Sequence, residues 1–386
     1  MKDMRFLILA LLVLLIGCEK DSDNTISKKK VLSDNPLKSP QDLMVDKMVM
    51  AYASKSTTAG FSLALISPSA VVQYNYGETR IGNKTLPNNK TLYEIGSLTK
   101  TFIAPSLLHW MDQNNIELSS PIAEYLPLEV RANLSLNNSP VTFKHLLAHL
   151  SGLPRIPSDL PNTLDPYKGY DSTKVYSYLK KNKLLRAPGT PPKSEDDLSN
   201  YYSNLAYGLA GLILERNMHK PLKTILYENF FNKEGEGILG KFAMPNSTLG
   251  DIEGVVNRAF PHNLTNNAQY WHLSGLAAAG GIKSCLADMI EYAKGQLSSE
   301  NSNNVIGACH IPVVSINNRD YFGLGWEYYY TSSGKRLVVK DGGTGGFTAF
   351  IAFDKTSGKA MVALFNNSAD NEPATPFVDL METFFK

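Results

Sequence analysis

The sequence predicts an α/β fold in which both ends of the chain supply one sheet and a helical insertion lies between them. β-rich runs separated by turn residues occur near the start and again near the end of the chain. From about residue 122 to 296 the pattern is instead one of helices and long loops, broken by two groups of prolines. No clean linker separates two independent units. We therefore expect one domain over residues 41–386, with its sheet from 41–121 and 297–386.

The first 40 residues are expected to precede this domain. Lys2 and Arg5 come before an apolar run from Phe6 to Ile16, which is the layout of a signal peptide over residues 1–17. The run is too short for a membrane span, which needs roughly 20 apolar residues. The residues around Cys18 resemble the bacterial lipobox, which implies cleavage before Cys18 and lipidation of its thiol. The alternative is an ordinary secreted precursor.

Residues 18–40 are predicted to be a flexible tether, because they are rich in Lys, Ser, Asp and Asn and contain few large apolar side chains. The expected protein is thus exported and anchored to the cell envelope through a lipid, on its periplasmic or surface face. The chain of 386 residues has a net charge of +2 and 43% hydrophobic residues, so it carries no strong electrostatic field for nucleic acid. An exported protein permits a bridge between Cys285 and Cys309 without requiring one.

Several elements follow from local pattern. A hairpin is predicted from Phe61–Ser67 and Val71–Tyr76, which Pro68, Ser69 and Ala70 separate. The aromatic run that begins at Trp326 favours a strand over a base-stacking platform. The spacing of apolar residues predicts a helix at the C-terminal end. The remaining predictions at this end are strands over Leu337–Lys340, Phe347–Asp354 and Lys359–Phe365 and a helix over Thr375–Phe385.

The first chemical motif is Ser97-Leu98-Thr99-Lys100, followed by an apolar stretch with helical character. Ser97 is therefore expected at a helix start, where Lys100 projects from the same face one turn later. The positive end of the helix dipole favours negative charge developing at that place, as on a serine alkoxide. Pro105 is expected to kink or shorten the helix. Ser-x-x-Lys alone is a weak signal, since a capping serine with a solvated lysine gives the same letters.

Two further motifs follow in order: Tyr202-Ser203-Asn204 at the start of a second helical stretch, and Lys340-Asp341-Gly342-Gly343 at the end of a strand. With these three motifs the chain resembles class C β-lactamases and serine D-alanyl-D-alanine carboxypeptidases, which carry Ser-x-x-Lys, Tyr-x-Asn and Lys-Thr-Gly in this order. The resemblance covers about residues 42–385. It implies the β-lactamase/transpeptidase-like fold, an antiparallel sheet flanked by helices with a helical subdomain, and an active site in the groove between them.

The resemblance also implies roles. Ser97 is the acylated nucleophile, Lys100 hydrogen-bonds its hydroxyl, and Tyr202 accepts or relays the proton, which requires nearby cations to favour its anion because a phenol has an ordinary pKa near 10. Substrate binding is implied for Asn204, Lys340, Gly342, Gly343 and Asn371. The backbone N–H groups of Ser97 and Gly343 are the implied oxyanion hole. Asp341 departs from the Lys-Thr-Gly pattern.

Other chemistries fit the residues less well. His145 and His149 are expected to pack or cap a helix, because no Glu completes a zinc-binding His-Glu-x-x-His motif. The chain has no Gly-x-Ser-x-Gly motif, which argues against an α/β-hydrolase. We expect a monomeric serine hydrolase without metal or cofactor, acting on β-lactams or D-alanyl peptides of cell-wall precursors. The alternatives are a carboxylesterase for small esters and a non-catalytic envelope-binding lipoprotein.

Overall fold

The computed structural model describes residues 30–231, 237–240, 242–265, 267–299, 304–368 and 374–386. Within these residues no helix is long and apolar enough to cross a membrane. The predicted signal segment, Cys18 and Asn371 lie outside the described residues, so the roles predicted for them stay predictions.

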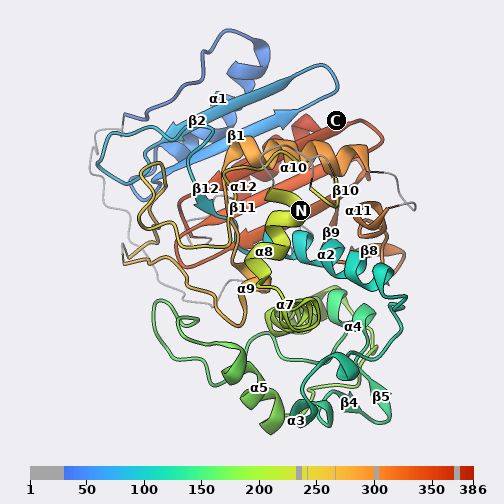
Figure 1. Ribbon diagram of the computed structural model, residues 1–386. Helices are drawn as coiled ribbons and strands as arrows, with labels where there is room; N and C mark the ends of the chain where they lie inside the picture. Colours follow the sequence, from blue (N-terminus) through green and yellow to red (C-terminus); the bar gives the residue numbers. More distant parts are fainter. Residues whose placement is uncertain (1–29, 232–236, 241, 266, 300–303, 369–373) are drawn as a thin grey trace.

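An eight-stranded antiparallel sheet with the order β2-β1-β12-β11-β10-β9-β8-β7 forms the centre of the fold (Figure 1). The first hairpin is β1 (Gly60–Ile66) with β2 (Val71–Gly77), and β1 pairs with β12, which joins the two ends of the chain. The predicted fold class is confirmed. The remaining strands of this sheet are β7 (Val314–Ile316), β8 (Arg319–Phe322), β9 (Glu327–Tyr330), β10 (Arg336–Gly343), β11 (Thr348–Asp354) and β12 (Lys359–Phe365).

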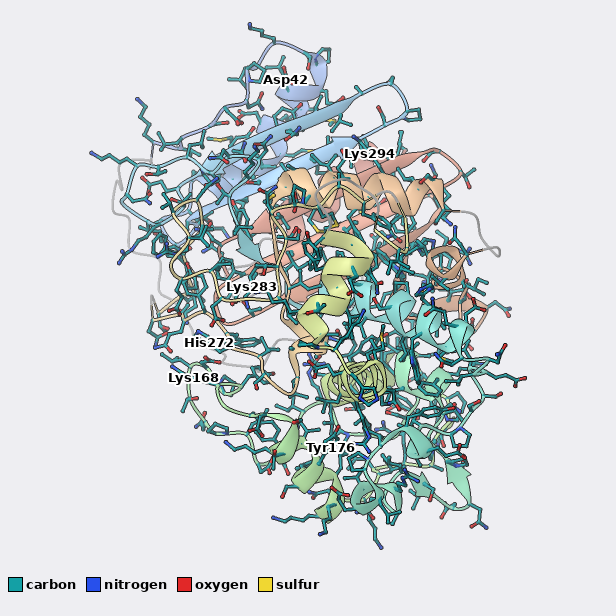
Figure 2. All side chains as sticks on the ribbon, viewed as in Figure 1. Asp42, Lys168, Tyr176, His272, Lys283 and Lys294 are labelled. Carbon is teal, nitrogen blue, oxygen red and sulfur yellow. The ribbon has the colours of Figure 1, made fainter. Side chains whose placement is uncertain are left out.

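Helices cover both faces of the sheet, and the side chains of its inner strands β1 and β12 are therefore buried on both sides. The helices α1 (Pro40–Ala53) and α12 (Ala374–Phe384) pack against each other and close one core cluster, whereas α10 (Leu286–Ser298) contacts β1, β11 and β12 in the other. Figure 2 marks Asp42 on α1 and Lys294 on α10. Ser39 caps α1 with a capping box, a helix start that the sequence analysis left unassigned.

The helical subdomain lies below the sheet in Figure 1. Its long helix α7 (Asn204–Met218) packs against α9 (Ala277–Gly280) and against α2 (Lys100–Gln113), which runs through Pro105 as one helix instead of ending there. Its other helices are α3 (Leu128–Arg131), α4 (Phe143–Leu147), α5 (Ser172–Lys181), α6 (Leu198–Tyr201) and α8 (Leu222–Leu226), while α11 (Val305–Ala308) contacts α2.

Short strands complete the fold. The pair β3 (Tyr93–Glu94) and β6 (Lys283–Ser284) leads into the segment that carries Ser97, and β4 (Ser135–Leu136) pairs with β5 (Ser139–Pro140). Cys285 and Cys309 are both buried and free, so no bridge joins them.

Candidate active site

Ser97 lies in a turn of 3₁₀ helix, Gly96–Thr99, directly before α2 begins at Lys100. Ser97 was expected at a helix start, and it lies in the short turn that leads directly into α2. Gly96 has φ +50°, and a Cβ atom there would lie 2.6 Å from the backbone nitrogen of Gly343. Glycine is required at this position because the turn adopts a left-handed conformation in contact with the backbone of β10.

Lys100 is completely buried, and its Nζ lies 3.0 Å from Ser97 Oγ. It also donates to Asn204 Oδ1 at 2.8 Å and to the carbonyl oxygen of Ala279 at 2.6 Å. Burial lowers the pKa of Lys100 well below its ordinary value, and the positive charges of Lys340 and Arg155 lower it further. All three neighbours are oxygen atoms within hydrogen-bonding distance of Nζ, and the lowered pKa means that Lys100 loses its proton at a lower pH than an exposed lysine does.

Tyr202 lies between α6 and α7 with 8% of its surface exposed, and its interaction with Ser97 acts to lower the pKa of the phenol. Two contacts hold this segment: the backbone N–H of Ser203 donates to His149 Nδ1 at 3.0 Å, and Ser203 Oγ donates to the carbonyl of Pro154 at 2.7 Å. The rings of His149 and Tyr202 are stacked with centroids 4.3 Å apart. His149 thus supports the site by packing, while His145 takes part in the capping box of α4.

Three basic side chains surround the Tyr202 ring. Lys100 Nζ and Lys340 Nζ lie 4.9 and 5.0 Å from its centroid, and the guanidinium carbon of Arg155 lies at 5.0 Å. Burial nevertheless raises the pKa of the Tyr202 phenol, and Lys340 offsets this only in part. Lys340 favours the Tyr202 anion, as the sequence analysis expected of the neighbouring cations, but burial outweighs this effect and the pKa of the phenol stays above its ordinary value.

Lys340 and the glycines after it come from the end of β10. Lys340 is 1% exposed, and its Nζ lies 2.5 Å from Glu327 Oε1 and 3.4 Å from Asp341 Oδ1. Burial alone would lower the pKa of Lys340, but the carboxylate of Glu327 raises it on balance. A Cβ atom on Gly342 would lie 2.1 Å from the carbonyl oxygen of Ile95, so β10 and the serine turn are in backbone contact.

The structure thus brings together Ser97, Lys100, Tyr202, Asn204 and Lys340 with the glycines of β10. A groove at this point is lined by Ser97, Tyr167, Asn204, Trp271, Leu273, Ala279, Gly280, Gly343 and Thr344. Its aromatic wall is the edge-to-face pair of Tyr167 and Trp271, with centroids 5.0 Å apart. The sequence analysis assigned no role to this pair.

Glu327 and Arg155 were also missed by the sequence analysis. A charged residue directly after Trp326 at the start of a predicted strand is the only local signal for Glu327, and nothing local places it against Lys340. No group of three or more possible metal ligands occurs among the described residues.

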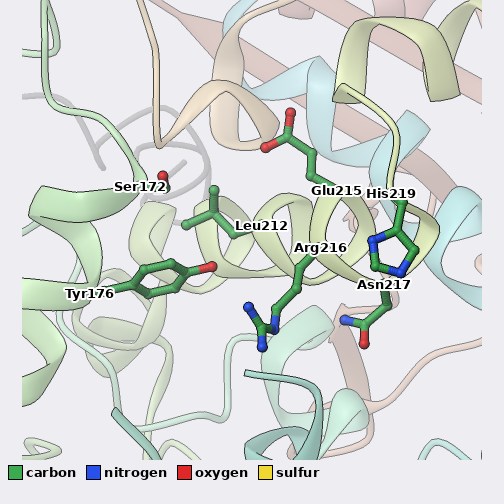
Figure 3. Close-up of a pocket in the computed structure, with 7 residues that line it drawn as sticks. All are labelled: Ser172, Tyr176, Leu212, Glu215, Arg216, Asn217 and His219. Carbon is green, nitrogen blue, oxygen red and sulfur yellow. The ribbon is translucent and has the colours of Figure 1, made fainter. Parts of the chain in front are cut away.

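A second cavity of about 540 Å³ lies between α5 and α7 (Figure 3). It shares no lining residue with the groove at Ser97, and none of the three motifs contributes to it. Glu215 on its wall accepts a hydrogen bond from the backbone N–H of Leu222. The acyl-transfer groups are therefore confined to the first groove. The cavity is lined by Ser172, Tyr176, Leu212, Glu215, Arg216, Asn217 and His219.

Comparison with known proteins agrees with this geometry. The family model described as Beta-lactamase matches residues 45–377. The D-alanyl-D-alanine-carboxypeptidase/endopeptidase AmpH of Escherichia coli K12 is 28% identical over 323 residues, covering 78% of this chain and 77% of that protein. A β-lactamase of Pseudomonas fluorescens is 25% identical over 369 residues, covering 85% and 94%. The crystal structure of a β-lactamase/D-alanine carboxypeptidase from Yersinia pestis is similar in fold, with a TM-score of 0.71, 24% identity and coverage of 89% and 99%.

Proposed function

The chain belongs to the β-lactamase family and is a serine hydrolase, and from this we propose that it cleaves β-lactam rings or D-alanyl peptide bonds through an ester of Ser97. One observation carries the proposal: Lys100 Nζ lies 3.0 Å from Ser97 Oγ and 4.9 Å from the centroid of the Tyr202 ring, so residues of two different motifs meet at the nucleophile. Relatives named as a carboxypeptidase/endopeptidase and as a β-lactamase support the substrate class.

In the proposed acylation step, Ser97 Oγ attacks the substrate carbonyl carbon while its proton passes to the neutral amine of Lys100. The carbonyl oxygen becomes an oxyanion and accepts hydrogen bonds from the backbone N–H groups of Ser97 and Gly343. The carbonyl then re-forms as the bond to the leaving group breaks. The Tyr202 hydroxyl gives its proton to the departing nitrogen or oxygen and regains one from the Lys100 ammonium.

Deacylation reverses these roles with water as the nucleophile. Water attacks the Ser97 ester and loses a proton to the pair of Lys100 and Tyr202, and the proton returns to Ser97 Oγ as the acid is released. Asn204 is proposed to orient the substrate amide, since its Oδ1 is held by Lys100. No step needs a metal ion or an organic cofactor.

The experiment is a turnover assay with a chromogenic cephalosporin, a D-alanyl-D-alanine peptide and a neutral p-nitrophenyl ester. Hydrolysis of at least one of the first two substrates should be lost in Ser97→Ala. The matched control is Ser69→Ala, which removes the same hydroxyl from the exposed turn between β1 and β2. Turnover of the ester alone would favour the carboxylesterase, and no turnover with any substrate would favour a non-catalytic envelope protein.

We further propose that the protein is exported, lipidated at Cys18 and active as a monomer. The apolar run before Cys18 and the polar tether after it support export and anchoring. Cells given an alkyne fatty acid should label the wild type but not Cys18→Ser. Equal labelling of both would reject this anchor.

The monomer is a separate proposal. Its support is that all three motifs come from one chain, and the sedimentation of the purified protein would test it.

A further inference from the structure

Two irregular loops meet in the aromatic wall of the groove at Ser97. The first loop, residues 155–170, carries Tyr167, and the second, residues 267–276, carries Trp271. Neither loop contains a helix or a strand, so no regular ladder of hydrogen bonds holds either one. The place of the wall therefore depends on contacts between the two loops.

The carboxylate of Asp165 joins the two loops. Its Oδ2 lies 2.6 Å from Nδ1 of His272, and its Oδ1 accepts the backbone N–H of His272 at 3.2 Å. The side chain of Asp165 is 7% exposed and that of His272 is 27% exposed. On the other side of the ring, His272 Nε2 lies 3.5 Å from Oε1 of Glu253, which is 56% exposed. Asp165 is therefore the inner anchor of His272, whose place in the molecule Figure 2 marks.

The chain neighbours of this pair include the wall itself. His272 directly follows Trp271, and Asp165 directly follows Leu164. The carbonyl oxygen of Leu164 accepts a hydrogen bond from the indole Nε1 of Trp271 at 3.0 Å. Asp165 and the residue before it thus hold both the backbone after Trp271 and its ring. A change at Asp165 reaches the groove through Trp271, which lines it.

Other contacts keep the loops together without Asp165. The backbone N–H of Gly275 donates to the carbonyl of Tyr170 at 2.8 Å, and the backbone N–H of Trp271 donates to Glu94 Oε1 at 2.9 Å. On the second loop these contacts use the backbone alone, so they do not fix the direction of the side chains. We therefore expect loss of the Asp165 carboxylate to loosen the wall without detaching the loops.

The wall lies beside Asn204, which is proposed to orient the substrate amide. Both Asn204 and Tyr167 line the groove. Burial raises the pKa of Tyr167, and its interaction with Asn204 acts to lower that pKa, so the two side chains are neighbours. A flat apolar substituent on the substrate amide would meet the edge-to-face pair of Tyr167 and Trp271.

We propose that Asp165 is a positioning residue that, through His272, holds the aromatic wall in place to receive an aromatic substituent on the acyl side of the substrate. Asp165 does not itself line the groove, so it acts through Trp271. The inference rests on the proposed function, because it assumes that the acyl group lies beside Asn204 during transfer to Ser97.

Two matched pairs of substrates test the proposal: N-acyl-D-alanyl-D-alanine and a chromogenic cephalosporin, each with phenylacetyl or acetyl on its amide nitrogen. The quantity measured is the ratio of kcat/KM for the phenylacetyl substrate to that for the acetyl substrate, in which the chemistry of the leaving group cancels. Asp165→Asn should lower this ratio about threefold to tenfold, mainly through a higher KM for the phenylacetyl substrate, because the lost contact is remote from the reacting atoms. His272→Gln changes the more exposed partner and should lower the ratio by a similar factor.

A double-mutant cycle with Trp271→Ala separates positioning from a general structural role. In the Trp271→Ala protein the wall is already lost, so Asp165→Asn should leave the ratio unchanged. Asp320→Asn is the matched control, because it removes the carboxylate that pairs with Arg336 at the opposite end of β10 from Gly343. This control should keep the wild-type ratio.

A wild-type ratio in folded Asp165→Asn would overturn the proposal. So would an equal fall in kcat for both members of a pair, or an effect of Asp165→Asn that is as large in Trp271→Ala as in the wild type. If Asp165→Asn does not fold, His272→Gln and its own cycle with Trp271→Ala decide by the same criteria. The proposed function fails separately, and only if Ser97→Ala still hydrolyses these substrates.

Discussion

Replacing Gly342 by Ala tests the contact between β10 and the serine turn. The new Cβ atom would lie 2.1 Å from the carbonyl oxygen of Ile95, where ordinary contacts begin at about 3.4 Å. Relief therefore requires a separation of about 1.3 Å between two backbone segments. Neither segment moves freely, because Ile95 donates to the carbonyl of Ile282 at 3.1 Å and β10 is paired with β11.

The predicted loss follows from this displacement. Moving β10 away from Ser97 separates the two N–H groups proposed for the oxyanion hole. Loss of one such donor typically costs about 3 kcal/mol, which is roughly a hundredfold or more in kcat. A misplacement of about 1 Å near reacting groups has an effect of similar size. We expect Gly342→Ala to lower kcat/KM at least about a hundredfold.

The assay is steady-state hydrolysis of the best substrate from the turnover panel, with circular dichroism to verify the fold. Gly254→Ala is the control, because a Cβ atom at Gly254 would meet no other atom within 4 Å. Its activity should remain near that of the wild type. A folded Gly342→Ala protein with activity within fivefold of the wild type would refute the argument that this backbone contact sets the oxyanion hole.

Two further predictions concern buried titratable groups. Lys100→Met and Tyr202→Phe should each lower turnover by orders of magnitude, and near-normal turnover in Tyr202→Phe would remove Tyr202 from the mechanism. In the wild type, kcat/KM should rise with pH as Lys100 loses its proton, at a pH below the ordinary pKa of lysine. Burial lowers the pKa of His310 to about 3. Between that value and the ordinary value of about 6.5 the unfolded chain binds more protons, so stability falls as pH falls through this window, by up to about 1.4 kcal/mol per unit. Urea titrations should show a smaller loss for His310→Phe, and equal losses would contradict the assignment.

The elements that the sequence predicted well are those with a strong local pattern. Lys359–Phe365 has the predicted bounds of β12, and the first hairpin differs by one residue at its ends, because a run of β-formers beside turn residues is decided locally. The short strands β7 and β8 were missed, since three or four residues carry little pattern. Pro105, which was expected to kink or shorten the helix, lies inside α2, which continues to Gln113.

The candidate site likewise contains residues that sequence motifs identified and contacts that no local pattern revealed. The resemblance carried by the three ordered motifs implied that Ser97, Lys100 and Tyr202 share one site, and the structure places the three residues together. The contact of Glu327 with Lys340 depends on the register of β9 against β10, which no local pattern reveals. The protonation states were also hidden, because burial sets the pKa of Lys100 and Tyr202 and depends on distant chain segments.

The central claim is that Ser97 carries the acyl group, and peptide mass mapping after reaction with a fluorophosphonate or a slowly hydrolysed β-lactam tests it most directly. The account predicts one adduct per chain, on the peptide that contains Ser97, and no adduct in Ser97→Ala. An adduct on Ser151 or Ser203, or undiminished labelling of Ser97→Ala, would contradict it.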